Sequence, residues 1–445
     1  MTIQDLVREA SFEEIPLSAD DCLKCNVCNT VCPVARVTDL FPGPKYVGPQ
    51  AQRFRLATLV PPQSAASPRD ESPDHTVDYC SGCGMCTIAC PADVKIAEMN
   101  NRSRAELKAG HRPRVRDWLL GQTDLVGRLG VAFSPLANWS LRNRPIRWLI
   151  ELFMGIHRRA PLPAFAGTTL RTELRRERRD GSGVGAEPPP ARAVVLFHGC
   201  AANYYEPHVA RAAMDVLGRN GFETIVPEQA CCGLPLMNNG LYPAARAKAT
   251  RNLGVLADYA RRGYRIVGTS TSCTHTLKAE YREMLDLDDA DARTVADATW
   301  DICEFLVSLH DDGRLDTRFG PLEETLPYHA PCQLRGHGIG LPAMDLFALV
   351  PGLTALDMDH DCCGIAGTYG LKKEKYDIAM AVGDALFTRI KETETPQAAC
   401  DSETCRWQIQ GATGRPTRHP VEILAAAYRA YDGAGPEVEA VATSR

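Results

Sequence analysis

The runs DCLKCNVCNTVCPVA at positions 21–35 and DYCSGCGMCTIACPAD at positions 78–93 decide the fold of the N-terminal part of the chain. Each run has the spacing C-x2-C-x2-C-x3-C-P, and every cysteine of the second run lies 58 positions after its counterpart in the first. Cysteines at this spacing bind cubane [4Fe-4S] clusters. The two runs therefore predict a helical domain with two clusters over residues 1–110.

The spacing also predicts which cysteines share a cluster. In the bacterial-ferredoxin pattern, the closely spaced cysteines bind three corners of one cluster, and the cysteine before proline binds the other cluster. Structural zinc sites also use C-x2-C pairs, but eight cysteines with both prolines in register argue against zinc. The expected ligands are Cys22, Cys25, Cys28 and Cys90 for cluster 1, and Cys80, Cys83, Cys86 and Cys32 for cluster 2.

Composition narrows the class of protein. The chain has 445 residues, enough for two or three units, and 18 of them are cysteines. The first twenty residues, MTIQDLVREASFEEIPLSAD, are acidic and lack the apolar segment of a signal peptide. The cysteines are therefore expected to be thiolates on metal in a reducing cytoplasm. The net charge of -5 argues against nucleic acid as the main partner.

A second cysteine pattern occurs twice in the C-terminal part of the chain. Each copy has a cysteine, then a Cys-Cys-Gly triplet, then a last cysteine, and the copies are offset by 131 or 132 positions. A histidine precedes the first cysteine, and a serine lies three residues before the last, so two copies of one unit are the simplest interpretation. The matched residues are His198, Cys200, Cys231, Cys232, Ser270 and Cys273 in the first copy, and His329, Cys332, Cys362, Cys363, Ser402 and Cys405 in the second.

Short apolar runs alternate with amphipathic segments in each copy. The first copy is expected to have strands at 193–197, 223–226 and 264–269 and helices at 206–220 and 241–262. The second copy follows the same order, with its long helix at 372–392. This alternation is typical of an α/β unit whose cysteines lie at strand ends and turns. We call the copies CCG units, after their Cys-Cys-Gly triplets.

The expected fold class is therefore α+β and α/β, with a helical bacterial-ferredoxin-type 2[4Fe-4S] domain followed by two repeated α/β CCG units. Between them lie a basic aromatic segment and a stretch that begins as a charged helix and ends as a Gly- and Pro-rich linker. The expected boundaries are 1–110 for the ferredoxin-type domain, 111–170 for the basic segment, 171–192 for the helix and linker, and 193–310 and 322–430 for the CCG units.

The CCG cysteines are candidate metal ligands, although their spacing is not a cubane pattern. Gly233 and Gly364 permit the sharp bend that adjacent cysteines need in order to point at one centre. Each set has four thiolates, which suits an iron-sulfur cluster or a tetrahedral zinc. Buried free cysteine is the alternative. It is the preferred interpretation for Cys303, which lies alone on an apolar stretch, and Cys400 stays open between the two.

The segment at 111–170 carries positive charge and aromatic residues together. From His111 to Ala160 there are nine arginines and only three acidic residues, with Trp118, Trp139 and Trp148 among them. Such a composition suits a segment lying in a membrane interface, or a helical layer between domains with its arginines in solvent. Arginines interrupt every apolar run, so no segment is expected to span a bilayer.

The double ferredoxin motif followed by two Cys-Cys-Gly units resembles one family of iron-sulfur proteins, over Cys22 to about Ile423. This family includes the iron-sulfur C subunit of anaerobic glycerol-3-phosphate dehydrogenase, the glycolate oxidase iron-sulfur subunit, and the B and D subunits of heterodisulfide reductase. The resemblance implies additional noncubane clusters, or zinc, at two places. These are CCG site 1 (Cys200, Cys231, Cys232 and Cys273) and CCG site 2 (Cys332, Cys362, Cys363 and Cys405).

One departure from the family pattern affects these sites. Family members often end each unit in C-x2-C, whereas Ser270 and Ser402 occupy the first of those positions here. A noncubane cluster with five thiolates would lose one ligand in each unit, unless Cys400 substitutes in the second.

The resemblance also implies a role within an oxidoreductase complex. A partner dehydrogenase subunit with FAD would oxidise glycerol 3-phosphate or another hydroxy acid, and this chain would pass the electrons to a membrane quinone, with menaquinone expected. The sequence itself has no G-x-G-x-x-G opening a βαβ unit for FAD. The expected location is the cytoplasm, peripheral on the inner face of the cell membrane. Two alternatives stay open, namely a thiol–disulfide redox subunit like heterodisulfide reductase and a carrier of electrons between proteins only.

Overall fold

The computed structural model describes residues 21–52, 73–109, 111–180, 187–359 and 362–434. Contacts between Cα atoms divide the chain into two units, Met1–His111 and Arg112–Arg445. Each unit has a hydrophobic core of its own. The linker expected at the end of 171–192 falls partly on residues 181–186, which lie outside the described residues.

The first unit consists of short helices joined by turns, and its described residues contain no strand. Each cysteine run has two left-handed residues, Lys24 and Asn26 in the first and Gly82 and Gly84 in the second. A single helical turn begins directly after Asn26 and after Gly84. The expected helical character is thereby confirmed. The elements are α2 (Val27–Thr30), η2 (Tyr46–Gln50), η3 (Pro73–Tyr79), α4 (Met85–Ile88) and α5 (Ile96–Lys108).

Helix α5 organises the core of the first unit, because it packs against η2, η3 and α4. One cluster of this core, among the described residues, includes a cysteine from each motif: Cys28, Cys86, Val94, Ile96, Ala97 and Met99. Whatever these two cysteines bind therefore lies against the packed interior of the unit.

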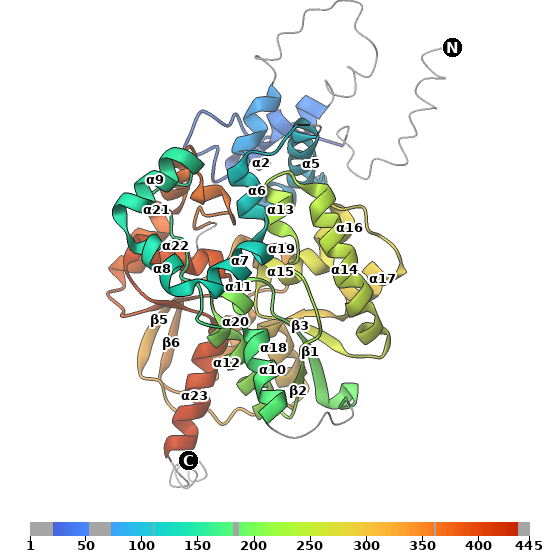
Figure 1. Cartoon of the computed structure of the whole chain (residues 1–445), viewed down its shortest axis with the longest axis vertical. Helices are drawn as coiled ribbons and strands as arrows, with labels where there is room; N and C mark the ends of the chain where they lie inside the picture. Colours follow the sequence, from blue (N-terminus) through green and yellow to red (C-terminus); the bar gives the residue numbers. More distant parts are fainter. Residues whose placement is uncertain (1–20, 53–72, 110, 181–186, 360–361, 435–445) are drawn as a thin grey trace, which may run out of the picture. The chain divides into compact units, whose positions relative to one another are not determined.

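The second unit contains two parallel four-stranded sheets (Figure 1). The strand order is β2-β1-β3-β4 in one sheet and β6-β5-β7-β8 in the other, so the two sheets have the same topology. This confirms the expected fold class, with one α/β sheet in each CCG unit. The strands are β1 (Ala193–Phe197), β2 (Glu223–Ile225), β3 (Arg265–Gly268), β4 (Thr299–Asp301), β5 (Glu324–His329), β6 (Leu353–Asp357), β7 (Ala398–Cys400) and β8 (Thr417–Arg418).

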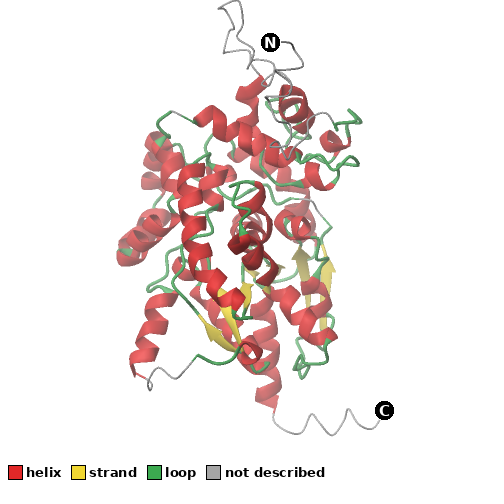
Figure 2. Cartoon of the chain, turned by 90° about the vertical axis from the view of Figure 1, so that its right-hand side faces the viewer, coloured by secondary structure: helices red, strands yellow, loops and turns green. Residues whose placement is uncertain are grey.

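Helices connect the parallel strands of the first CCG unit and cover its sheet (Figure 2). All five residues of β1 are buried, as expected for a central strand covered on both faces. Both long helices have proline in their first turn, where it leaves no hydrogen bond unmade. The helices are α11 (Ala201–Tyr204), α12 (Pro207–Arg219), α13 (Leu234–Asn238), α14 (Tyr242–Arg261), α15 (Thr271–His275), η5 (Thr276–Glu280), α16 (Tyr281–Glu283), α17 (Ala290–Ala298) and α18 (Ile302–Asp311), preceded by η4 (Pro190–Arg192).

The second CCG unit repeats this arrangement with shorter connections. Its long helix begins four residues later than the sequence pattern predicts, because Lys372 forms a β-bridge with Ile156 and Lys373–Lys375 form a turn. The helices are α19 (Cys332–His337), α20 (Pro342–Phe347), η6 (Tyr369–Leu371), α21 (Tyr376–Glu392), α22 (Glu403–Thr413) and α23 (Pro420–Ala434).

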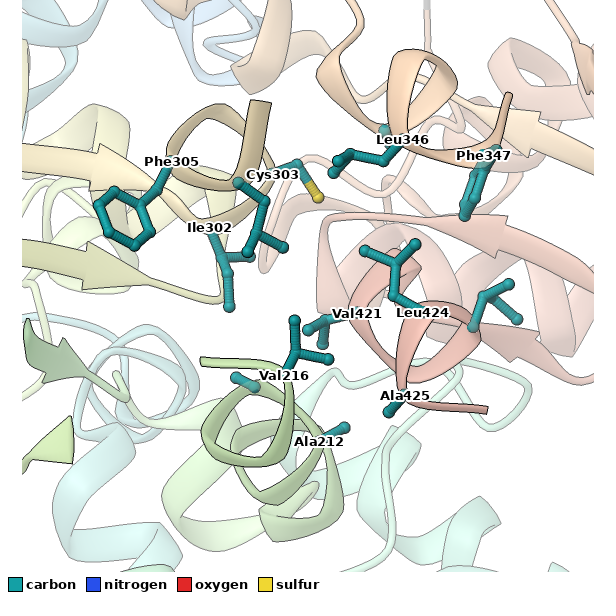
Figure 3. Close-up of a cluster of buried hydrophobic side chains, with 14 of the residues drawn as sticks. Ala212, Val216, Ile302, Cys303, Phe305, Leu346, Phe347, Val421, Leu424 and Ala425 are labelled. Atoms are coloured by element: carbon teal, nitrogen blue, oxygen red, sulfur yellow. The ribbon is translucent and has the colours of Figure 1, made fainter. Parts of the chain in front are cut away.

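One hydrophobic core joins the two CCG units (Figure 3). Val216 of α12 lies opposite Val421 and Leu424 of α23, which come from different copies. Burying each aliphatic side chain of this size stabilises a fold by about 1.5–3 kcal/mol. Cys303 of α18 is fully buried in the same core, near Leu346, which agrees with its interpretation as a structural cysteine.

Among the described residues, five α-helices follow His111 and precede the first sheet in sequence, and glycines allow one of them, α7, to pack closely. A Cβ atom on Gly127 would lie 2.4 Å from the Tyr204 ring, and one on Gly130 would lie 2.1 Å from the Phe165 ring. None of the helices in the described part of the chain is both long and apolar enough to cross a bilayer. The five are α6 (Val115–Gly121), α7 (Thr123–Ala132), α8 (Ser134–Arg142), α9 (Arg144–Met154) and α10 (Leu170–Asp180).

Candidate metal centres

Cys28 interacts with three other cysteines of the first unit, and the four form the first group. Burial raises the pKa of its thiol, and the charges of Cys22, Cys25 and Cys90 raise that pKa further. These interactions require the four sulfurs to lie near one another. The structure thus brings together the set expected for cluster 1, including the cysteine that comes from the other motif.

Cys86 marks the second group. Burial raises the pKa of its thiol well above the usual value, and the charges of Cys80, Cys83 and Cys32 add to the effect. Burial also raises the pKa of Cys32 to about 11. This group is the set expected for cluster 2, and again the cysteine before proline comes from the opposite motif.

Both groups have a donor set that fits a [4Fe-4S] cluster. Each offers four convergent sulfurs, and the raised pKa values of Cys28 and Cys86 mean that a bare thiolate at either position is unfavourable without a positive partner. Iron supplies that partner, because metal binding holds cysteine in the thiolate form. The Asn100 side-chain amide lies 3.9 Å from the Cys80 sulfur, where it can donate a weak hydrogen bond.

CCG site 1 lies at the ends of elements of the first sheet. Cys200 follows β1, Cys231 and Cys232 precede α13, and Cys273 lies in α15. The Cys232 and Cys273 sulfurs are 3.5 Å apart. Hydrogen bonds with Cys200 and Cys232 lower the pKa of Cys231 well below the usual value, so the four predicted cysteines form a connected group.

Helix α7 supplies residues around CCG site 1 that the sequence pattern does not reveal. The Asp124 Oδ2 atom accepts a hydrogen bond from the Cys231 backbone N–H at 3.2 Å. The same oxygen accepts one from the Lys248 ammonium at 2.5 Å, and the positive charge of Lys248 favours a Cys231 thiolate. The basic segment is therefore fixed directly to this site.

Ser270 occupies the position where the family pattern has a further cysteine, and it has a structural role. Its hydroxyl oxygen accepts a hydrogen bond from the Cys273 backbone N–H at 3.4 Å and so caps α15. The same hydroxyl donates to Glu403 Oε2 of the other CCG unit at 2.8 Å. Ser270 thus links the two copies beside CCG site 1.

CCG site 2 is arranged differently from CCG site 1. The Cys363 and Cys405 sulfurs and a ring nitrogen of His329 all lie within 4.8 Å of one another, and all three residues are buried. Neither ring nitrogen of His329 has a hydrogen-bond partner among the described residues. A buried imidazole without a partner is costly, so this group fits a metal ion or cluster.

Cys400 and Cys362 lie near this group. Hydrogen bonds with Cys363 and then Cys400 lower the pKa of Cys405 well below the usual value, so Cys400 lies beside the site. The Cys362 sulfur accepts a hydrogen bond from the Gly364 backbone N–H at 3.2 Å. Cys332 is half-buried at the start of α19. The three-residue group with His329 contains neither Cys332 nor Cys362.

His329 could have been proposed from the sequence. Both copies have a histidine just before their first cysteine, and that repetition is the available signal. The two histidines differ in the structure, because His198 Nδ1 lies 2.6 Å from the Gly199 carbonyl oxygen and burial lowers its pKa to about 4. Nothing in the sequence distinguishes the two.

Comparison with known protein families gives two matches. Residues 18–94 match the model of a 4Fe-4S dicluster domain. Residues 194–278 and 326–410 each match the model of a cysteine-rich domain. The matches include the eight cysteines of the first unit and both CCG sites.

Comparison with individual proteins gives relatives that are similar in sequence over half of this chain or more. The C subunit of anaerobic glycerol-3-phosphate dehydrogenase from Escherichia coli is 34% identical over 92% of this chain and 98% of its own length. The B subunit of a fumarate reductase (CoM/CoB) from Methanothermobacter marburgensis is 24% identical over 91% of this chain and 70% of its own. Lactate utilization protein A of Bacillus licheniformis is 30% identical over 52% of this chain and 95% of its own.

Proposed function

Because this chain belongs to the family of iron-sulfur subunits that includes the C subunit of anaerobic glycerol-3-phosphate dehydrogenase, we propose that it passes electrons from a flavin-bearing dehydrogenase partner to a membrane quinone. The members of this family are subunits of oxidoreductase complexes. The name of the Escherichia coli relative suggests glycerol 3-phosphate as the substrate of the partner. The partner holds FAD in this proposal, and menaquinone is the acceptor.

Each set of cysteines holds one metal centre in this proposal. Iron-sulfur clusters, when bound, supply one-electron carriers. The chain's own residues position the sulfurs and exclude water, since Cys231 is 1% and Cys232 is 2% exposed. The proposed ligands are Cys22, Cys25, Cys28 and Cys90, then Cys80, Cys83, Cys86 and Cys32, then Cys200, Cys231, Cys232 and Cys273 at CCG site 1, and Cys332, Cys362, Cys363 and Cys405, with Cys400 and His329 beside them, at CCG site 2.

The observation that carries the quinone assignment is the two-sided character of α7. One side places Asp124 against the Cys231 backbone. The other side leaves Leu125 43% and Leu129 54% exposed. A hydrophobic acceptor approaching that exposed side would lie one helix away from CCG site 1.

Three exposed tryptophans in the basic segment also support membrane contact. A carrier between proteins, or a helical layer between domains, would bury Trp118, Trp139 and Trp148. Their exposed fractions are 39%, 56% and 49%. Exposed tryptophans among arginines suit the membrane interface, where aromatic rings lie at headgroup level. The proposed location is therefore peripheral, on the inner face of the cell membrane.

Thiol–disulfide chemistry at the CCG sites is the second candidate. The 3.5 Å contact between the Cys232 and Cys273 sulfurs is the observation that favours it, because two thiols at this distance could exchange with a disulfide. The burial of both residues speaks against it, since a disulfide substrate must reach a sulfur.

The test uses the complex of this chain with its dehydrogenase partner, purified without oxygen. We expect reduction of a menaquinone analogue when glycerol 3-phosphate is added, and none by this chain alone. Reduction of a disulfide in place of the quinone would establish the second candidate. Reduction of a protein acceptor only would establish the carrier.

Metal analysis of the same preparation tests the centres. We expect more than about eight irons per chain, or about eight irons with zinc, because two cubanes account for eight. About eight irons with no other metal would exclude the two CCG sites as metal centres.

A further inference from the structure

Five arginines surround one open pocket at the junction of α8, α9 and the loop that follows α9. The pocket has a volume of about 880 Å³. Its walls also include Trp148 and Leu162. The arginines are Arg142, Arg144, Arg147, Arg158 and Arg159.

Arg147 is held in the pocket wall by hydrogen bonds to the backbone. Its side chain is 6% exposed. Nε donates to the Arg158 carbonyl oxygen at 3.0 Å, and Nη2 donates to the carbonyl oxygens of His157 and Ala160 at 3.2 and 2.6 Å. Nη1 is buried and has no hydrogen-bond partner among the described residues. The hydrogen-bond partners of this guanidinium are backbone carbonyl oxygens, so its positive charge is held in the pocket wall without a hydrogen-bonded carboxylate among the described residues.

The other four arginines bring more positive charge than the neighbouring carboxylates balance. Arg158 pairs with Glu151 at 3.6 Å, and Arg159 pairs with the exposed Asp377 at 3.6 Å. Arg142 and Arg144 are exposed, and neither forms an ion pair with a described residue. The pocket therefore has a positive excess suited to an anion with several acceptor oxygens, such as a phosphate.

Large apolar side chains lie exposed beside this pocket. In α8, Leu136 and Trp139 are 64% and 56% exposed. In α9, Leu152 and Phe153 are 54% and 80% exposed, and Trp148 belongs both to this surface and to the pocket wall. Helices α8 and α9 pack against each other (Figure 1).

We propose that the arginine pocket binds the phosphate of an anionic phospholipid headgroup while the exposed apolar residues of α8 and α9 enter the acyl region. A phosphate beside hydrocarbon is the chemistry that a lipid presents and a free phosphate does not. This inference rests on the membrane contact in the proposed function and adds to it a headgroup site with a charge preference.

The experiment measures cosedimentation of the complex with phosphatidylcholine vesicles that either contain or lack phosphatidylglycerol. We expect tight binding only when phosphatidylglycerol is present. An Arg142→Gln/Arg144→Gln variant should bind about 30-fold more weakly, because two interfacial charges are lost. A matched Arg178→Gln/Arg179→Gln variant removes the same charge from exposed positions of α10 and should change binding by less than about twofold.

Three results would overturn the inference. Equal losses in the two variants would mean general charge attraction. Equal binding to both vesicle types would mean that no headgroup charge is recognised. Suppression of vesicle binding by inorganic phosphate or glycerol 3-phosphate at low concentration would mean a site for a soluble phosphate.

Quenching of tryptophan fluorescence by brominated phosphatidylglycerol adds a second readout. We expect quenching in the wild-type complex and a smaller effect in Trp148→Phe, whose ring cannot report from the pocket wall. Quinone-analogue reduction by the wild-type complex in detergent distinguishes the two proposals. Quinone reduction without vesicle binding would mean that the headgroup site is wrong and the proposed function stands. Vesicle binding without quinone reduction would mean that the headgroup site stands and the proposed function is wrong.

Discussion

Each cysteine sulfur acquires its chemistry from its immediate neighbours. At CCG site 1, Lys248 and Asp124 adjoin Cys231. At CCG site 2, His329 lies beside Cys363 and Cys405 instead. A positive ammonium favours thiolates, whereas an imidazole can itself be a ligand. Two sites with the same sequence spacing are therefore expected to differ in the metal they prefer.

Replacement of one CCG cysteine tests whether site 1 holds a centre of its own. We expect Cys232→Ser to remove one EPR signal and its share of the iron while the signals of the two cubanes remain, because Cys232 contacts Cys273 and lies in the other unit of the chain. Cys303→Ser is the matched control, since Cys303 is equally buried and should cause no loss of iron. Equal iron loss in both variants would show that the effect is one of folding.

Asp301 and Asp401 form a buried acidic pair where the two CCG units meet. Their carboxylate oxygens and the Cys303 sulfur lie within 4.8 Å. Asp301 caps α18 by accepting from the Cys303 backbone N–H at 2.9 Å, and Tyr328 donates to Asp401 at 2.6 Å. Burial, and then the charge of Asp401, raise the pKa of Asp301 well above its usual value, and burial raises the pKa of Asp401 to about 6.

This pair predicts the pH dependence of stability. An acid with a higher pKa in the folded state stabilises the fold fully below its unfolded pKa of about 3.9, and this contribution is lost as the pH rises through 6. Asp301→Asn keeps a capping acceptor but cannot ionise, so the stability lost between pH 4 and 8 should be smaller in this variant than in the wild type.

Urea unfolding at several pH values, followed by circular dichroism, measures this effect. Asp289→Asn is the control, because Asp289 caps α17 in the same way but is exposed. A parallel pH dependence in Asp301→Asn and the wild type would contradict the assignment of the raised pKa to this pair.

At the scale of elements, the two copies use the same turn with different clearances. Gly233 and Gly364 both have left-handed φ values, +97° and +85°. A Cβ atom on Gly233 would lie 3.4 Å from the Ala245 carbonyl oxygen in α14. A Cβ atom on Gly364 would lie 1.8 Å from the Ala379 carbonyl oxygen in α21. The long helix therefore packs much closer to the triplet in the second copy.

This difference predicts unequal effects of the same substitution. Gly233→Ala should cost about 1–2 kcal/mol, which is the left-handed strain alone. Gly364→Ala should cost more than about 3 kcal/mol, because backbone must move to relieve the clash. Chemical unfolding of both variants measures the difference, with iron content as a check on the sites. Similar losses would mean that α21 moves away at little cost.

At the scale of the molecule, the two CCG units are joined by polar contacts as well as by a shared core. Arg406 of α22 is 3% exposed and reaches Glu206, which precedes α12, at 2.5 Å. Trp407 donates to the other Glu206 oxygen at 2.8 Å. Together with the hydrogen bond from Ser270 to Glu403, these contacts fix the second CCG unit against the first CCG unit beside CCG site 1.

Removal of the Glu206 charge tests this connection. Glu206→Gln leaves Arg406 buried with only Glu403 to balance it, and we expect a loss of about 3 kcal/mol in the free energy of unfolding. Glu228→Gln is the matched control, because Glu228 pairs with Arg171 at 2.6 Å on the surface and its loss should change stability little. A small loss of stability in both variants would mean that the shared hydrophobic core alone holds the two CCG units together.

The sequence by itself determined the features that depend on local spacing. The C-x2-C-x2-C-x3-C-P runs predicted which cysteines of the first unit approach one another, because a short loop allows few arrangements of its sulfurs. The repeated cysteine order predicted two sheets of the same topology. Apolar runs placed β1 and α14 to within one or two residues, since burial on both faces or on one face leaves a clear periodicity.

Only the tertiary structure decided what surrounds those features. Asp124 and Cys231 are far apart in sequence, as are His329 and Cys405, so no local pattern relates them. The exposure of Trp139 and the unused donor of Arg147 also depend on what the rest of the chain covers. Burial is a property of the packed molecule, and one sequence of residues fits a covered or an uncovered helix equally well until the packing is known.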